Sequence, residues 1–166
     1  MITGVKKLLE LYPGLDDNQY QPAGIDLKLG KINVFDNTDD VYAIVDNRKQ
    51  LPKQIELPES AVKVGTTKLE VGYTLEPHKP YIAVVDKKIK IDKDYAQIYL
   101  PRSSLLRAGV DVRTALGDPG FHGHLSFLVI NHNEVPFFIK KGERFAQMIN
   151  IKVDEATSEY DGDYNE

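Results

Sequence analysis

Residues 125–151 read LSFLVINHNEVPFFIKKGERFAQMINI. Three short apolar runs occupy residues 125–130, 135–139 and 145–151, and polar residues and glycine fill the gaps between them. Runs of this length, rich in β-branched and aromatic residues and bounded by turn formers, are typical of β-strands. We therefore predict three strands here, the second of them returning antiparallel to the first.

The same pattern of short apolar runs separated by turn-forming residues extends through most of the chain. Only residues 5–12 carry a helical spacing of apolar side chains, and Pro13-Gly14 ends that pattern. Many short strands with little helix predict an all-β fold, either a sandwich or a barrel. The further short apolar runs, separated by clusters of Asp, Asn, Gly and Pro, lie at residues 25–29, 41–45, 61–64, 81–85 and 96–100.

The length of 166 residues suits a single domain. We assign this β domain to residues 1–153 and a flexible C-terminal tail to residues 154–166. The tail is acidic and its only aromatic residues are Tyr160 and Tyr164, a composition that favours a mobile arm over a packed element.

The composition argues against several classes of protein. With 21 basic and 25 acidic residues the net charge is −4, which disfavours binding to a nucleic-acid polymer. The absence of cysteine excludes disulfides and thiolate metal sites. No apolar run approaches the ~20 residues of a membrane-spanning helix. We therefore expect a cytoplasmic protein with a small-molecule partner.

Two polar segments carry the candidate chemistry. Residues 101–107 read PRSSLLR, in which two hydroxyls lie between two guanidinium groups, and such groups hold phosphate oxygens well. Residues 117–123 read GDPGFHG and place Asp118 in a Gly/Pro-rich turn beside an aromatic ring. A cationic cradle and a carboxylate that can polarise water indicate hydrolysis of a phosphorylated small molecule. The alternative is a turn with an exposed Arg-Ser surface.

Four segments resemble, in order, the signatures of the dUTPase and dCTP deaminase superfamily. They are residues 21–30 (QPAGIDLKLG), 101–109 (PRSSLLRAG), 117–123 (GDPGFHG) and 142–149 (GERFAQMI). Four ordered motifs are a more specific signal than any one of them. The resemblance covers nearly the full sequence. It implies a distorted jelly roll, a homotrimer whose sites are shared between subunits, and Mg²⁺ bound through the triphosphate.

The resemblance also implies roles for individual residues. Asp118 would polarise the water that attacks the α-phosphate, and Phe121 would stack on the deoxyribose. Asp26 would organise the water shell of the metal, or else be satisfied by backbone N–H groups in a turn. Glu143 and Arg144 are interpreted as structural. The other substrate contacts would come from Arg102, Ser103, Ser104, Arg107, Ser126, Phe127, Leu128, Gln147 and Tyr160.

Leu128 separates the two branches of the superfamily. The deaminases carry a glutamate at this position, which moves protons while water adds to C4 of cytosine. A leucine can neither accept nor donate a proton, and general acid–base catalysis contributes ~10²–10⁴-fold. The leading interpretation is therefore a dUTP diphosphatase that yields dUMP and pyrophosphate, clears dUTP from the nucleotide pool and supplies dUMP for dTMP synthesis. Tyr160 would stack on the base as the tail closes.

Three departures from the dUTPase pattern leave alternatives open. The segment between Ser104 and Asp118 is shorter, Gly117 stands where an isoleucine is usual, and the arginine-bearing fifth motif is absent. One alternative is a catalytically weak nucleotide sensor or protein-binding module on the same fold. Others are a dCTP deaminase, a bifunctional dCTP deaminase–dUTPase, and a jelly-roll structural protein.

Overall fold

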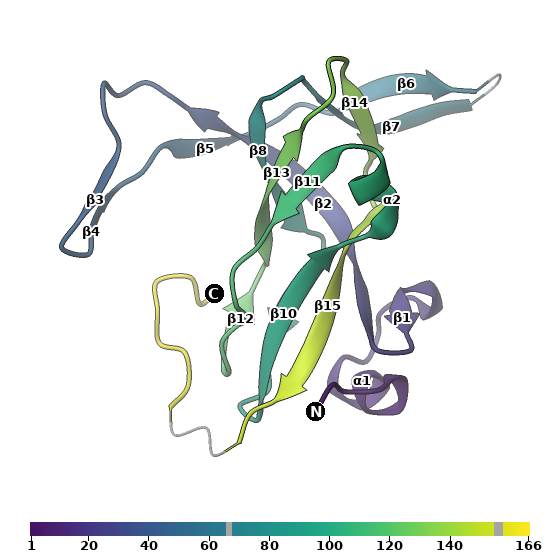
Figure 1. Cartoon of the computed structure of the whole chain (residues 1–166), viewed down its shortest axis with the longest axis vertical. Helices are drawn as coiled ribbons and strands as arrows, with labels where there is room; N and C mark the ends of the chain where they lie inside the picture. The colour runs from purple at the N-terminus through teal and green to yellow at the C-terminus, as the bar shows by residue number, and fades with distance from the viewer. Residues whose placement is uncertain (66–67, 155–157) are drawn as a thin grey trace.

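The computed structural model describes residues 1–65, 68–154 and 158–166 and confirms the predicted all-β fold (Figure 1). Within these residues the helical elements are α1 (Val5–Leu11), the 3-10 turn η1 (Asp17–Gln19) and α2 (Ser103–Arg107). The strands are β1 (Tyr20–Gln21), β2 (Gly24–Asp36), β3 (Ala43–Val45), β4 (Arg48–Gln50), β5 (Lys53–Glu56), β6 (Ser60–Val64), β7 (Lys68–Leu75), β8 (Pro80–Val85), β9 (Ile89–Lys90), β10 (Tyr95–Pro101), β11 (Val110–Arg113), β12 (His122–Gly123), β13 (Ser126–Asn131), β14 (Phe137–Lys140) and β15 (Arg144–Lys152).

One antiparallel sheet makes up most of the fold. Its hydrogen-bonded order is β10-β15-β2-β8-β13-β11, and β1 and β5 also pair with β2. The two ends of this path, β10 and β11, contact each other, so the sheet curls into a nearly closed barrel (Figure 1). The two end strands are not hydrogen-bonded to each other, so the barrel stops short of full closure.

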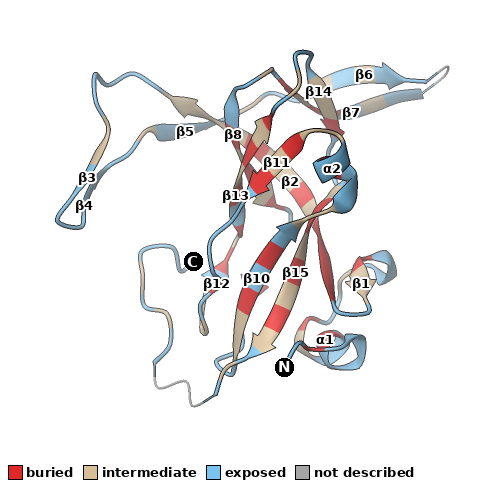
Figure 2. Ribbon diagram, in the orientation of Figure 1, coloured by how far each residue is buried: buried red, intermediate tan, exposed pale blue. Residues whose placement is uncertain are grey.

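The core is formed by side chains that alternate along each strand. In β13, Phe127, Val129 and Asn131 are buried, while the residues between them are half-buried or exposed. Figure 2 shows buried residues alternating with more exposed ones along β10 and β15. Because successive side chains of a strand point to opposite faces, the period-two pattern of the sequence becomes an inner and an outer face of the barrel.

One predicted pairing is wrong. β13 pairs with β8 and β11, whereas β14 does not return along β13 but pairs with β7 in a separate sheet with β6. The buried side-chain amide of Asn131 donates to the carbonyl oxygens of Leu75 at 3.0 Å and Val135 at 2.8 Å. These bonds hold the chain beside β7 and so direct it out of the main sheet.

The helix predicted near the start of the chain is confirmed. α1 buries Leu8 and ends at Leu11, one residue before the predicted end, with Tyr12 as its C-cap. The sequence did not predict α2, because a helix of five residues is too short to display a recognisable 3.6-residue repeat. No helix in the described parts of the chain is long and apolar enough to cross a bilayer.

Candidate active site

A Gly/Pro-rich turn presents Asp118 to solvent. Gly117 and Gln97 exchange both of their backbone hydrogen bonds, at 2.8 and 2.9 Å, which fixes the start of the turn against β10. The N–H of Phe121 donates to the carbonyl oxygen of Asp118 at 3.2 Å, and the carbonyl oxygen of Phe121 accepts from Ile91 N–H at 2.8 Å. These bonds hold the backbone on both sides of Asp118 in place. The residue itself is exposed.

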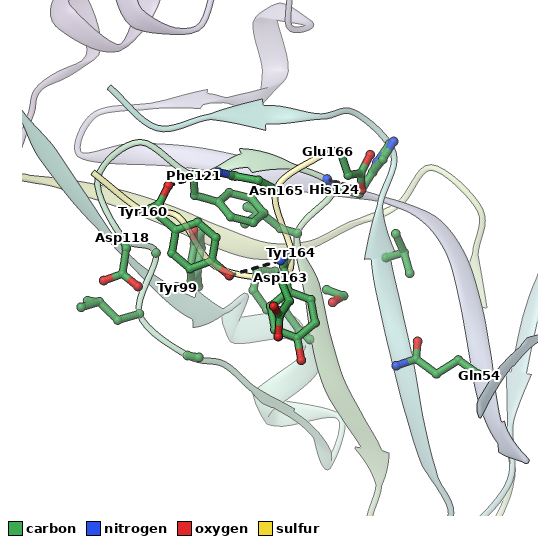
Figure 3. A pocket seen from close by; sticks show the side chains of 17 residues that line it. Gln54, Tyr99, Asp118, Phe121, His124, Tyr160, Asp163, Tyr164, Asn165 and Glu166 are labelled. Atoms are coloured by element: carbon green, nitrogen blue, oxygen red, sulfur yellow. Dashed lines mark hydrogen bonds between the residues drawn. The ribbon is translucent and has the colours of Figure 1, made fainter. Parts of the chain in front are cut away.

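Asp118 lines a pocket of about 580 Å³ (Figure 3). Phe121, Ser126 and Phe127 also line it, as does Tyr99 from β10. A pocket of this size, walled by aromatic side chains and carrying a few polar groups, is typical of sites for small ligands. The structure thus brings together four of the predicted site residues.

The C-terminal segment covers part of this pocket. The ring of Tyr160 meets Phe121 edge-on, with centroids 5.7 Å apart and planes at 69° (Figure 3). The N–H of Tyr160 donates to the carbonyl oxygen of Pro119 at 2.7 Å, and Glu166 forms an ion pair with Lys88 at 2.9 Å. Residues 155–157 of the predicted flexible tail lie outside the described residues. The described residues 158–166 place Tyr160 in the pocket, so the tail contributes a fifth predicted residue there.

A projecting hairpin, β3–β4, reaches the same segment. The ammonium group of Lys49 lies 3.0 Å from a carboxylate oxygen of Asp163 and 5.4 Å from the ring centroid of Tyr164. The hydrogen bond to Asp163 raises the pKa of Lys49. The hairpin and the tail are therefore joined by polar and cation–π contacts beside the pocket.

Two guanidinium groups and one amide gather around the carboxylate of Asp26. Oδ2 of Asp26 lies 3.2 Å from Nε of Arg102 and 3.2 Å from a terminal nitrogen of Arg144. Nε2 of Gln147 donates to Oδ1 of Asp26 at 3.4 Å. Burial raises the pKa of Asp26, and the two guanidinium groups oppose that rise. Three of the four sequence motifs thus meet at one buried carboxylate, which orients Arg102 at the start of α2.

One chain therefore presents the predicted site in two parts. Ser103, Ser104 and Arg107 lie on α2 and are exposed. Leu128 lies on the face of β13 opposite to Phe127, and is half-buried. Figure 1 shows α2 well separated from β12, which follows the Asp118 turn. The predicted residues that do not line the Asp118 pocket are Asp26, Arg102, Ser103, Ser104, Arg107, Leu128 and Gln147.

Several residues that border the pocket or its cover were missed from the sequence, Tyr99 and Lys49 among them. Tyr99 belongs to a strand whose alternation marks it simply as core, and Lys49 lies in a charged hairpin with no motif. The one signal in the sequence that could have pointed to Tyr99 was Gly117. Glycine has no side chain, so a group from another part of the chain can fill the space beside Asp118. In the residues described by the structure, no three His, Cys, Asp or Glu side chains are grouped to hold a metal.

Comparison with known proteins identifies the family. The family described as dCTP deaminase-like matches residues 5–153. The chain belongs to the dCTP deaminase-like family. Two archaeal relatives are each named probable deoxyuridine 5′-triphosphate nucleotidohydrolase. The protein from Methanopyrus kandleri is 40% identical over 164 residues, 99% of each chain. The protein from Methanothermobacter thermautotrophicus is 40% identical over 166 residues, 100% of each chain.

A solved structure supports the fold assignment. The 2′-deoxycytidine 5′-triphosphate deaminase of Agrobacterium tumefaciens superposes with a TM-score of 0.63 at 20% identity, over 90% of this chain and 46% of that one. The present chain thus spans about half the length of that enzyme. At this identity the likeness supports the fold alone.

Proposed function

We infer that this chain hydrolyses dUTP to dUMP and pyrophosphate, and so is a dUTP diphosphatase. The archaeal relatives, 40% identical over nearly their full length, carry names for this activity. The observation in the structure that carries the proposal is the exposed carboxylate of Asp118 in an aromatic-walled pocket. Leu128 stands where deamination requires a proton-carrying side chain, so the deaminase alternatives are not favoured.

The proposed reaction is attack of water on the α-phosphorus. The carboxylate of Asp118 accepts a proton from the water, whose oxygen forms the new bond to phosphorus. The bond from the α-phosphorus to the oxygen bridging to the β-phosphate breaks, and pyrophosphate leaves with that oxygen. Phe121 stacks on the deoxyribose in this proposal. Its position beside Asp118 in the pocket wall supports that role.

Arg102, Ser103, Ser104 and Arg107 form the proposed phosphate cradle. Guanidinium groups bind phosphate oxygens through two parallel hydrogen bonds, and hydroxyls add further donors. The ion pair of Arg102 with Asp26, at 3.2 Å, holds that guanidinium ready at the start of α2. Gln147 donates to the same carboxylate at 3.4 Å, and we propose that its amide is a further donor to the phosphates.

Magnesium is the proposed cofactor, carried on the triphosphate. The exposed carboxylate of Asp118 fits such an ion without ligating it, because it can accept hydrogen bonds from the waters that Mg²⁺ retains. Asp26 does not fit as a direct ligand, because its Oδ2 already receives Arg102 and Arg144. When bound, the ion stabilises the negative charge that develops on the phosphates.

We propose that a neighbouring copy completes the site in a homotrimer. In one chain the cradle does not line the Asp118 pocket, so a cradle from a second copy would supply the missing cations. Exposed apolar side chains on β10 and α2 are candidates for this contact between copies. Exposed apolar patches often mark sites of protein association. Ile98 and Leu100 share the outer face of β10, and Leu106 follows on α2, with 40%, 47% and 67% of each residue exposed.

Incubation with dUTP, dCTP or dTTP, with and without Mg²⁺, tests the activity. We expect pyrophosphate release from dUTP in the presence of Mg²⁺, and no deaminated product from dCTP by chromatography. Conversion of dCTP at a rate near that of dUTP would support the bifunctional alternative. Tight dUTP binding without hydrolysis would support the nucleotide sensor. The proposed substrate is a free nucleotide, and we propose that the activity is cytoplasmic.

A further inference from the structure

Tyr99 lies beneath the turn that carries Asp118. It lines the pocket although only 4% of the residue is exposed. Its ring packs against Phe127 with centroids 4.9 Å apart, and its hydroxyl donates to Oε1 of Gln97 at 2.6 Å. Burial raises the pKa of Tyr99, so its hydroxyl stays protonated and remains a donor.

A series of buried hydrogen bonds fixes this hydroxyl. Nε2 of Gln97 donates to the hydroxyl of Tyr12 at 2.7 Å, and Nδ2 of Asn150 donates to the same hydroxyl at 2.9 Å. Gln97 and Asn150 are both 0% exposed. Buried polar groups whose partners are all present hold one arrangement, because breaking any bond leaves a group unsatisfied in a low dielectric. The end of α1, β10 and β15 thereby fix the position of Tyr99.

Gly117 lies directly against this tyrosine. A Cβ atom at residue 117 would collide first with the hydroxyl of Tyr99, and would also come within 2.8 Å of Cδ1 of Ile91 and 2.9 Å of Cβ of Gln97. Tyr99 therefore fills the volume that a side chain at residue 117 would occupy. Asp118 is the next residue, so the position of its backbone depends on how Gly117 rests on the tyrosine.

We propose that Tyr99 is a positioning residue, which sets where the carboxylate of Asp118 stands in the pocket through its contact with Gly117. The inference deepens the proposed function and rests on it, because Asp118 is the general base there. It also accounts for the glycine before the aspartate, since Tyr99 takes the space of a larger residue. Removal of the hydroxyl leaves Oε1 of Gln97 without its partner and frees space above Gly117.

Tyr99→Phe tests the proposal, since it keeps the ring and removes only the hydroxyl. A misplacement of ~1 Å can cost up to ~10²-fold in rate, so we expect kcat for dUTP to fall by about tenfold while KM stays within about twofold. Tyr81→Phe is the matched control: Tyr81 is 1% exposed and its hydroxyl accepts from Glu76 N–H at 2.9 Å, but it does not line the pocket. An equal loss in both variants would assign the effect to general stability and overturn the proposal.

A double variant separates this inference from the proposed function. If Tyr99 acts through Asp118, then Tyr99→Phe lowers kcat in the wild type but changes it little in an Asp118→Asn background. Additive losses in the two backgrounds would overturn the positioning role and leave the role of Asp118 intact. An Asp118→Asn variant as active as the wild type would overturn the proposed function, and the positioning role with it.

A second variant guards against poor folding of the first. Tyr12→Phe removes the hydroxyl that holds Gln97 and lies outside the pocket lining. We expect it to lower kcat in the same selective way but less, because it acts on Tyr99 through one further residue. Thermal melting of each variant shows whether the fold is retained. If Tyr99→Phe does not fold, a Tyr12→Phe variant that folds and has the wild-type kcat would overturn the proposal on its own.

Discussion

Asp118 is the residue on which the proposed chemistry depends. Asn in its place keeps the size of the side chain and removes the proton acceptor, so we expect Asp118→Asn to lower kcat for dUTP by ~10²–10⁴-fold. The side chain is exposed, so fold and assembly should be unchanged in circular dichroism and size-exclusion chromatography. The matched control is Asp111→Asn, which removes a carboxylate paired with Arg113 at 2.8 Å, outside the pocket lining. Turnover of Asp118→Asn close to that of the wild type would refute its role.

Ser103→Ala tests the phosphate cradle by the smallest change. Ser103 opens α2 and is exposed, so the fold does not depend on its hydroxyl. Loss of a hydrogen bond to a charged group costs ~1.5–3 kcal/mol, either in binding or in the transition state. Calorimetric titration with a non-hydrolysable dUTP analogue measures the loss in binding. Steady-state kinetics measure the loss in the transition state. Unchanged affinity combined with unchanged turnover would count against the cradle.

Among the elements, the C-terminal segment and the β3–β4 hairpin meet beside the pocket. Tyr160 contacts Phe121, and Lys49 pairs with Asp163 at 3.0 Å. Stacking of an aromatic ring on a base contributes ~1–3 kcal/mol, and exclusion of water strengthens the polar contacts around the phosphates. We therefore propose that the tail opens to admit the nucleotide and closes over it.

Truncation after Val153 tests this lid. We expect the trimer to persist and the affinity for dUTP to fall about tenfold or more, since one stacked ring is worth ~1–3 kcal/mol. Lys49→Gln, which removes the cation from the hairpin and leaves the tail intact, should move the affinity in the same direction by less. Unaltered kinetics in the truncated chain would show that the tail is a passive end. Tighter nucleotide binding would instead show that the tail competes with the substrate.

Local pattern predicted the strands but not all of their partners. Period-two alternation is visible within a few residues, so β2, β10, β13 and β15 could be located from sequence. The partner of β14 is decided by Asn131 and its bond to Leu75, a contact between segments far apart in the chain. In the site too, local patterns could be recognised in the sequence, but contacts between distant segments could not. Motifs predicted Asp118 and Phe121, whereas Tyr99 carries no motif and its contact with Gly117 exists only once β10 and the turn are brought together.

Across the whole molecule, the two parts of the proposed site are held on different surfaces of one chain. The Asp118 pocket does not include the cradle on α2. If the protein forms the proposed homotrimer, light scattering should give a mass three times the 18.7 kDa of one chain. A cyclic trimer repeats one heterologous contact, so each cradle would face the pocket of the next copy in the ring.

Mixed trimers test this sharing directly. Asp118→Asn lacks the base, and the double variant Ser103→Ala/Ser104→Ala lacks two donors of the cradle, so each alone should be nearly inactive. In the proposed trimer every site takes Asp118 from one chain and the serines from its neighbour. When the two variants are co-expressed in equal amounts, about half of the sites receive an intact Asp118 and about half of those also receive intact serines, so about a quarter of the sites are complete. We therefore expect activity to recover to about a quarter of the wild-type value per site. The control mixes the two proteins after purification, under conditions in which light scattering shows no subunit exchange, and it should stay inactive. Co-expressed trimers that are no more active than the average of the two parents would show that each site lies within a single chain.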